Sequence, residues 1–398
     1  MTERSPFSQK LSEESRANVL ACLGVTAAKD SPELTAYLNY LQAELRGAER
    51  LKPRSTIQTH DDATQRFELL KSHPRTSKSD IAKLGPSPPN FTDLDVLVRV
   101  FLVTACQSPG TAGGGVTNPS WRGYETLEDY VNRVYPQRPP SGDGEWETVE
   151  AGKLMASYLT SEGRMKIKWT DRLSDHLAIA PGPDWKTVHL FRFPLYLKSC
   201  LENLQSLDTE SRQVCHKCLE RGCLPFPLLH ETLRTYNLIF PLSDLPSRKV
   251  LKRSLSDVSS EHSDQFLDLS SMPDTHEWPE ETHPEDLLSL YEQYPFWGRR
   301  LESLLRGVDN PKPTTAFEKW ANSHKSQWWD TWWGMLGIGI ALTVGLLSLV
   351  LAGLQVWLTY CSWIDDVRAP GCGWKAKYHP AVEAAVEAAV SRRYILGR

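Results

Sequence analysis

One uncharged stretch constrains the fold of this 398-residue chain more than any other feature. From Thr331 to Ile364 the sequence contains no Asp, Glu, Lys, Arg or His. Its most apolar part, Gly334 to Leu354, is about as long as the ~20 residues that cross a hydrocarbon layer of ~30 Å. A buried helix of a soluble protein is the alternative, but such helices rarely lack charge over so long a run. The stretch therefore predicts a single transmembrane helix over residues 331–363.

Aromatic residues gather on both sides of this apolar core. Indole and phenol rings prefer the headgroup level of a bilayer, so they mark where a span enters and leaves the membrane. The residues are Trp328, Trp329, Trp332 and Trp333 on one side, and Trp357, Tyr360 and Trp363 on the other. The pattern places the anchor between about Trp332 and Trp357.

Small residues recur at four-residue spacing along this predicted helix. Gly337, Ala341, Gly345 and Gly353 share one face, which Leu349 interrupts. Such a face lets two helix backbones approach closely, so it predicts packing against another membrane helix and a homo-oligomer. Glycine is also common in membrane helices for other reasons, so the alternative of a lipid-facing stripe stays open.

The chain start indicates on which side of the membrane the large N-terminal part lies. Residues 1–10 are polar and contain no apolar run of signal-peptide length. We therefore expect the N-terminal domain in the cytosol, with the eight cysteines reduced. Lys and Arg residues on the two sides of the span are balanced, so flanking charge does not decide the orientation. Which membrane holds the chain is left open.

Composition shifts divide the chain into segments. Pro, Ser, Lys and Gly mark one linker, and a run with acidic but no basic residues marks a second, which we predict to be disordered. The expected order is an N-terminal helical segment (1–70), a linker (71–90), a helical cytosolic domain (91–242), an acidic disordered linker (243–290), a juxtamembrane segment (291–330), the transmembrane helix (331–363) and a C-terminal tail with a short helix (364–398).

The predicted fold class is mainly α with a few short strands, plus the single C-terminal transmembrane helix. Residues 166–169 and 188–191 read as short strands, and helices are expected at 194–204 and 228–240. This alternation is compatible with a winged-helix-like unit. However, the net charge of −4 gives no general basic surface, so no nucleic-acid partner is expected.

A cysteine cluster is the strongest candidate for metal chemistry. Cys215, Cys218, Cys223 and His230 have the spacing C-x2-C-x4-C-x6-H, and zinc binds four N or S ligands in a tetrahedron. The chain has no second C-x2-C, and His230 lies in an expected helix. Unligated cysteines are the favoured interpretation, with zinc the alternative and a Cys-x-x-Cys redox pair a distant third.

A second cluster, Asp171, Asp175 and His176, lies within six residues. Two carboxylates on one helix face could hold a metal, but Asp171 is more simply a helix-start residue that favours the helix dipole. No G-x-S-x-G, H-E-x-x-H or dinucleotide-binding motif occurs, and we predict no catalytic residue and no cofactor-binding residue.

Three passages together resemble a known group of proteins. They are the stretch 166–177, which contains Trp-Thr-Asp-x-Leu-x-Asp-His-Leu; the stretch 224–241, which contains Glu-Thr-Leu-Arg-Thr; and Tyr294-Pro-Phe-Trp297 ahead of the span. In that order they resemble a family of filamentous-fungal proteins of uncharacterised function with one C-terminal membrane span. The resemblance covers roughly residues 91–360 and implies the architecture but no activity. The cysteine cluster is not part of the family pattern.

These observations favour a membrane-tethered protein-interaction module, held in the lipid bilayer and binding a cytosolic protein partner. The alternative is a membrane-bound enzyme or a zinc or redox protein that uses Cys215, Cys218 and Cys223, or Asp171, Asp175 and His176. A deep pocket that gathers those side chains would favour the alternative, whereas an open surface would favour the binding module.

Overall fold

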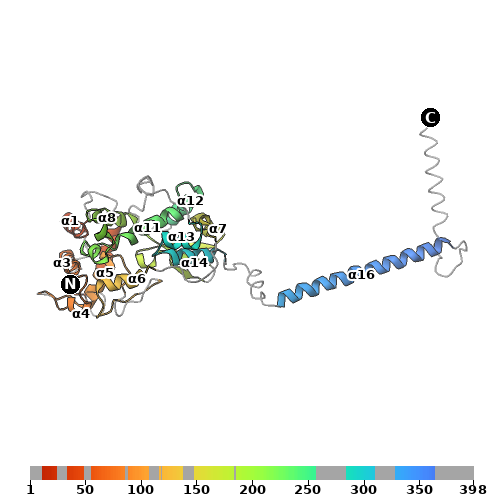
Figure 1. Cartoon of the computed structure of the whole chain (residues 1–398), viewed down its shortest axis with the longest axis horizontal. Coiled ribbons are helices and arrows are strands. Elements are labelled where there is room, and N and C mark those ends of the chain that lie inside the picture. Colours follow the sequence, from red (N-terminus) through yellow and green to blue (C-terminus); the bar gives the residue numbers. More distant parts are fainter. Residues whose placement is uncertain are drawn as a thin grey trace, which may run out of the picture. The chain divides into compact units, whose positions relative to one another are not determined.

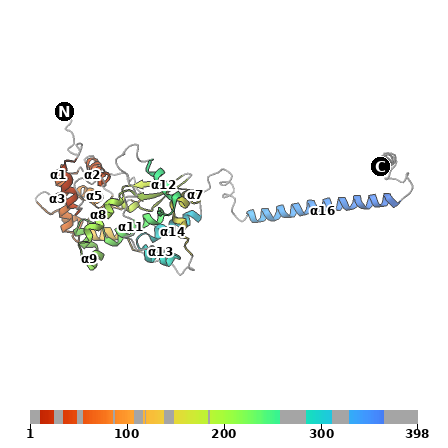
Figure 2. The ribbon, with the colours of Figure 1, turned by 90° about the horizontal axis from the view of Figure 1, so that it is seen from above.

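A computed structural model of the chain divides into two units, residues 1–314 and residues 315–398. Figures 1 and 2 show the helical first unit from two directions, and the long helix α16 of the second. The structure describes the following residues: 11–24, 34–48, 55–85, 88–106, 116–117, 119–137, 148–182, 185–256, 284–309 and 328–363.

The N-terminal half of the first unit is built around a helix that is buried along nearly its whole length, α5 (Phe91–Phe101). Its start is fixed by a capping box between Asn90 and Asp93, in which each side chain accepts a hydrogen bond from the other residue's backbone amide. The surrounding helices are α1 (Glu13–Cys22), α2 (Thr35–Ala48), α3 (His60–Ser72), α4 (Lys78–Ile81) and α6 (Leu127–Val134).

Tyrosine hydroxyls complete the hydrogen bonding at the other end of α5. The last carbonyls of a helix lack partners within it, and here they are buried. Tyr37 donates to the Val100 carbonyl at 3.2 Å, Tyr40 to the Arg99 carbonyl at 3.1 Å, and Tyr196 to the Phe101 carbonyl. These bonds fix α2 and the later part of the unit to the central helix.

A small mixed sheet lies in the C-terminal half of the first unit. Its strands are β1 (Met165–Thr170), β2 (Ile179–Pro181) and β3 (Lys186–Phe191), in the order β1-β3-β2. The pair β1 and β3 is parallel, with Ile167 opposite Val188, and β2 runs antiparallel to β3. Between β1 and β2 the chain makes a single 3-10 turn, η4 (Leu173–Asp175).

Helices complete this half: η3 (Ala151–Leu154), α7 (Ala156–Ser161), α8 (Pro194–Leu204), α9 (Thr209–Gln213), α10 (Cys215–Glu220), α11 (Phe226–Ile239), α12 (Leu245–Ser256), α13 (Leu287–Gln293) and α14 (Gly298–Asp309). Pro194 occupies the first position of α8, where a missing amide hydrogen costs nothing. One continuous apolar core runs from Val19 to Val308, so the described helices of the first unit share a single interior.

The predicted fold class is confirmed: the chain is mainly helical, with three short strands among the described residues and one long apolar helix. Both predicted strands are present as β1 and β3, and the helix expected at 194–204 is α8. The parallel pairing of β1 with β3 is not the antiparallel hairpin of a wing, so the winged-helix comparison does not extend to this sheet.

Two predicted linkers contain packed structure. Lys78 lies inside the expected linker 71–90, yet it is buried and pairs with Asp95. Composition could not reveal this, because a lysine among prolines and serines is usually solvated. In the expected linker 243–290, α12 packs against α7. Residues 257–283 and the tail 364–398 lie outside the described residues.

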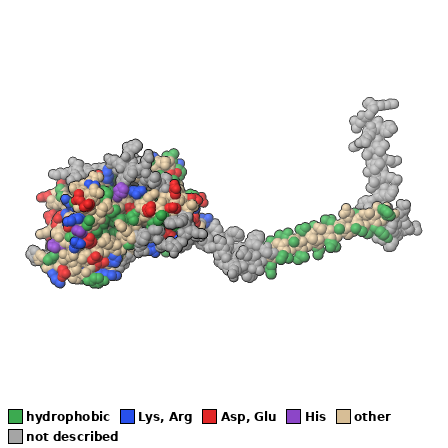
Figure 3. Space-filling model, in the orientation of Figure 1, with side chains coloured by type: hydrophobic (Ala, Val, Ile, Leu, Met, Phe, Trp, Pro, Cys, Tyr) green, Lys and Arg blue, Asp and Glu red, His purple; other side chains and the backbone are tan. Residues whose placement is uncertain are grey.

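The second unit contains α16 (Trp328–Trp363), a helix of 36 residues. Its segment Met335–Trp363 has a mean hydropathy of 2.4 in its most apolar window, and none of that window is buried within the chain. Figure 3 shows hydrophobic side chains along this helix. Within the described ranges, one helix is therefore long and apolar enough to cross a membrane, as the sequence predicts.

The cysteines of the two units differ. The six described cysteines of the first unit carry free thiols, as expected for a reducing compartment. In contrast, Cys361, near the carboxyl end of α16, is disulfide-bonded. The expectation that all eight cysteines are reduced is therefore wrong for Cys361.

Candidate functional site

The three passages that carry the family resemblance meet in the interior of the first unit, around Trp297. This side chain is only 1% exposed, and its indole nitrogen donates to Thr232 Oγ1 of α11 at 2.9 Å. Its ring contacts the His176 ring edge-on, with centroids 5.2 Å apart. Segments more than a hundred residues apart in sequence thus form one cluster.

His176 is held in one protonation state by its neighbours. The Phe191 amide donates to Nδ1 at 3.2 Å, so Nδ1 carries the lone pair and Nε2 the proton. Thr235 Oγ1 donates to the Thr232 carbonyl at 2.6 Å, and it accepts from His176 Nε2 at 2.8 Å. Burial lowers the pKa of His176 well below its usual value, so the ring is neutral and both nitrogens are engaged.

Glu231 fixes the turn that carries Trp297. Its carboxylate accepts the Phe296 amide at 3.0 Å and the Trp297 amide at 2.6 Å. Burial raises the pKa of Glu231 to about 8, although the two amide donors oppose that shift. The Glu231 side chain therefore joins α11 to the turn before α14, and these two amides occupy its carboxylate.

The predicted pair of carboxylates is not gathered. Asp175 accepts from the Thr117 amide at 2.8 Å and from the Thr117 hydroxyl at 2.6 Å. Asp171 is 39% exposed and pairs with Arg192. With one aspartate inside and the other at the surface, Asp171, Asp175 and His176 do not converge on one point.

Backbone strain marks the same region. Leu177 has φ of 60° and Val103 has φ of 45°, in the left-handed region that side chains with a Cβ rarely adopt. Hydrogen bonds hold both: the Leu177 amide donates to the His189 carbonyl at 2.7 Å, and the Leu173 amide donates to the Val103 carbonyl at 2.7 Å. The surroundings therefore impose the conformation of the segment that carries His176.

The cysteine cluster lies on the other side of the unit, around α10. Cys218 Sγ donates to the Arg212 carbonyl at 3.3 Å, and Cys223 Sγ lies 3.8 Å from the Cys200 carbonyl. Burial raises the pKa of Cys215 to about 12 and that of Cys218 to about 11. These thiols are protonated at neutral pH, whereas a redox cysteine has a lowered pKa.

His230 stacks on Phe226, with ring centroids 5.9 Å apart. Among the residues that the structure describes, no three His, Cys, Asp or Glu side chains are placed to hold a metal ion. Zinc at Cys215, Cys218, Cys223 and His230 therefore stays a prediction from spacing.

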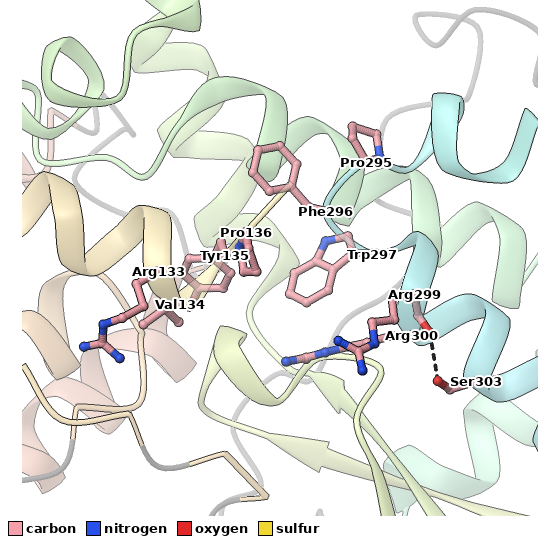
Figure 4. A pocket seen from close by; sticks show the side chains of 10 residues that line it. All are labelled: Arg133, Val134, Tyr135, Pro136, Pro295, Phe296, Trp297, Arg299, Arg300 and Ser303. Carbon is pink, nitrogen blue, oxygen red and sulfur yellow. Dashed lines mark hydrogen bonds between the residues drawn. The ribbon is translucent and has the colours of Figure 1, made fainter. Parts of the chain in front are cut away.

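The first unit has a pocket of about 320 Å³ between the end of α6 and the start of α14. Figure 4 shows Trp297 and Tyr135 facing each other at its centre, Arg299 and Arg300 reaching in from α14, and the Arg133 guanidinium pointing away. Tyr135 and Trp297 meet edge-on, with centroids 6.0 Å apart. The pocket adjoins the buried cluster through Trp297.

Arg299 and Arg300 were not singled out from the sequence. Two adjacent arginines before an amphipathic helix are typical of a solvated face, and nothing local shows that one of them is drawn inward. The usable signal was Trp297 itself, because a large apolar side chain in a Tyr-Pro-Phe-Trp turn is often buried. What lies beside it depends on tertiary structure.

The small residues of α16 remain without contacts inside the chain. A Cβ placed on Gly337, Gly345 or Gly353 would meet no heavy atom within 4 Å. Ala341 lies on the same exposed helix surface. Packing through this face stays a prediction.

Comparison of the chain with protein-family models, with curated proteins and with solved structures finds no match.

Proposed function

We propose that this protein is a membrane-tethered interaction module. Its first unit lies in the cytosol, and the pocket beside Trp297 contributes to binding a protein partner. The observation that carries the proposal is α16, whose apolar side chains are exposed over a length sufficient for a bilayer. Such a surface requires lipid or other membrane helices around it.

The cysteines support the proposed orientation. Free thiols are typical of a reducing compartment and disulfides of an oxidising one. The first unit has free thiols, and Cys361 at the far end of α16 is disulfide-bonded. A membrane between the two, with the N-terminal unit on the cytosolic side, accounts for both observations.

The resemblance to the fungal family is part of this proposal. Its three motifs lie apart in the sequence, and their side chains His176, Thr232 and Trp297 are in mutual contact. A shared interior explains why such motifs would occur together. It supports a common architecture and assigns no reaction.

The enzyme alternative lacks a comparable observation. Asp175, His176 and Glu231 are each engaged by internal hydrogen bonds, and none of them lines the pocket of Figure 4. The polar groups that do reach the pocket are arginine side chains and Ser303, which suit binding better than proton transfer.

Membrane attachment and orientation are tested on the full chain with a different tag at each end. Alkaline carbonate should leave the full chain in the membrane pellet and release a chain that ends before Trp328. Protease added to intact vesicles should remove the N-terminal tag and spare the C-terminal one. Release of the full chain, or protection of the N-terminal tag, would overturn the proposal.

Partner binding is tested by photocrosslinking in cells. A photoreactive residue at position 299 should give a discrete adduct of higher mass. The same residue at position 306 is the matched control, because Arg306 lies on the same helix, is 70% exposed and does not line the pocket. Equal labelling at both positions, or none at 299, would count against a partner at this pocket.

A further inference from the structure

Two arginines that make no ion pair with a described residue line the pocket between α6 and α14. Most cations near it have acidic partners. Arg133 contacts Glu125 through two bonds of 2.6 and 2.9 Å, and Arg306 pairs with Glu302. These two arginines are therefore paired, in contrast to Arg299 and Arg300 in the pocket.

Arg300 is a partly buried cation without a carboxylate partner among the described residues. It donates to the His176 carbonyl, and its guanidinium lies 4.9 Å from the centre of the Trp297 ring. The nearby acid, Asp175, is occupied by the amide and hydroxyl of Thr117. Burial lowers the pKa of Arg300, although the nearby Tyr135 and Asp175 oppose that shift.

Arg299 adds a second charge on the solvent side. It is exposed, lines the same pocket, and makes no ion pair with any residue that the structure describes. Figure 4 shows its side chain beside that of Arg300. Guanidinium groups bind carboxylate and phosphate oxygens with two parallel bonds, so two of them together form a receptor for an oxyanion.

The remaining walls are apolar. Tyr135 and Pro136 come from the end of α6, and Pro295, Phe296 and Trp297 come from the turn before α14. Rings and prolines offer flat surfaces to an aromatic or aliphatic group. The volume of about 320 Å³ lies at the lower end of the range for small-ligand sites.

We infer that this pocket binds an oxyanion, a carboxylate or a phosphate, carried on an aromatic or other apolar group. Arg299 and Arg300 bind the charge, and the aromatic and proline walls bind the stem. The inference deepens the proposed function, because it states what the partner presents to the pocket.

A bound oxyanion would offset the free-energy cost of holding an unpaired cation in the pocket. A cation that is withdrawn from water without a counter-ion is unfavourable, and a paired one is much less so. Binding therefore gains from charge that the fold already positions. In contrast, the fully paired Arg133 has little to gain from the same ligand.

The test is isothermal titration calorimetry on the full chain in lipid nanodiscs, with four probes: phenyl phosphate, benzoate, inorganic phosphate and phenol. We expect saturable binding of phenyl phosphate or benzoate. The stronger of these two identifies phosphate or carboxylate as the charged group. Phenol and inorganic phosphate, which each lack one half of the ligand, should bind at least about tenfold more weakly.

Four variants at three exposed positions localise the binding without disturbing the interior. Arg299→Gln and Ser303→Glu should each weaken the stronger probe about tenfold, the first by removing a cation and the second by adding an anion. Ser303→Gln is the matched control for size, and Arg306→Gln is the control for net charge. Both controls should bind as the unaltered chain does.

Three results would overturn the inference: phenol binding as tightly as phenyl phosphate, inorganic phosphate binding as tightly as phenyl phosphate, or Arg299→Gln binding normally. The absence of binding by all four probes would do the same. Failure of the proposed function is separate, because position 299 could fail to crosslink to a protein while the purified chain still binds phenyl phosphate.

Discussion

Gly163 of the first unit and Gly345 of α16 have opposite surroundings. At Gly163, after α7, an added Cβ would lie 2.7 Å from the Leu159 carbonyl oxygen and 3.0 Å from Val308. At Gly345 in α16 an added Cβ would meet nothing within 4 Å. The contacts of Gly163 are made within the chain, whereas any neighbour of Gly345 must come from outside it. The comparison predicts where a substitution changes folding and where it changes only association.

The largest effect should come from the buried ion pair of the first unit. Lys78→Met keeps most of the side chain but leaves Asp95 buried without its cation, and burial already raises the pKa of Asp95. We expect a loss of about 3–5 kcal/mol in the free energy of unfolding. Urea unfolding of the full chain in detergent, followed by near-UV circular dichroism, measures it.

The matched control is Lys83→Met, because Lys83 pairs with Asp80 and both side chains are exposed. It should change stability by less than about 1 kcal/mol. The double variant Lys78→Met with Asp95→Leu should recover most of the loss, since it removes both charges together. Equal effects of Lys78→Met and Lys83→Met would show that residues 71–90 are a solvated linker after all.

The next effect is a pH dependence at Glu231. Its pKa is about 8 in the folded chain, above the usual value of 4.5, so between these values the folded state holds a proton that the unfolded state has lost. The stabilisation of the folded state that is linked to Glu231 is therefore complete below about pH 4.5, and it declines by about 1.4 kcal/mol per pH unit towards pH 8. From pH 6 to 9 we expect the melting temperature of the first unit to fall by roughly 5–10 °C.

Glu231→Gln provides the control, because an amide of the same shape accepts the Phe296 and Trp297 amides without titrating. The variant should melt at nearly the same temperature across this range. A fall of equal size in the variant would assign the pH dependence to other groups.

A smaller effect is expected where the first unit leaves no room for a side chain. Gly163→Ala should cost about 1–3 kcal/mol, because the Leu159 carbonyl is backbone and cannot rotate away. Gly152→Ala is the matched control, since a Cβ there meets nothing within 4 Å, and its effect should stay within about 1 kcal/mol. If both substitutions were neutral in urea unfolding, the close contacts of Gly163 with Leu159 and Val308 would be refuted.

Features that depend on neighbouring residues could be predicted from the sequence, whereas features that depend on distant contacts could not. Helix α16 was predictable, because the length, absence of charge and aromatic ends that suit a bilayer are all local properties. Helix α8 and strands β1 and β3 were also predictable from their periodicity and from Pro194. Each of these features is set by neighbouring residues.

The pocket and the buried pairs were not predictable in the same way. The Lys78–Asp95 pair joins two helices, and Arg300 is drawn inward by a ring from the preceding turn and by the His176 carbonyl. No local pattern distinguishes such side chains from solvated ones, because their burial depends on which segments meet. The motifs 166–177, 224–241 and 294–297 implied the architecture, but their common interior and the charges beside it required the tertiary structure.

The smallest effect on folding, and the most selective one on assembly, should come from α16. Gly345→Leu adds a side chain where the chain itself has no contact, so the melting temperature of the first unit should not change. If the face of Gly337, Ala341, Gly345 and Gly353 packs against a second copy, the larger side chain separates the two backbones. Chemical crosslinking in detergent should then yield roughly threefold less dimer.

Gly339→Leu makes this measurement decisive. Gly339 belongs to the same helix and also has nothing within 4 Å, but at ~100° per residue it lies about 120° around the helix from Gly345. It should therefore leave the crosslinked dimer unchanged. Equal loss in both variants would indicate a general effect of bulk on the span, and no loss in either would show that lipid covers the small-residue face. Only a loss confined to Gly345→Leu assigns that face to a second copy of the chain.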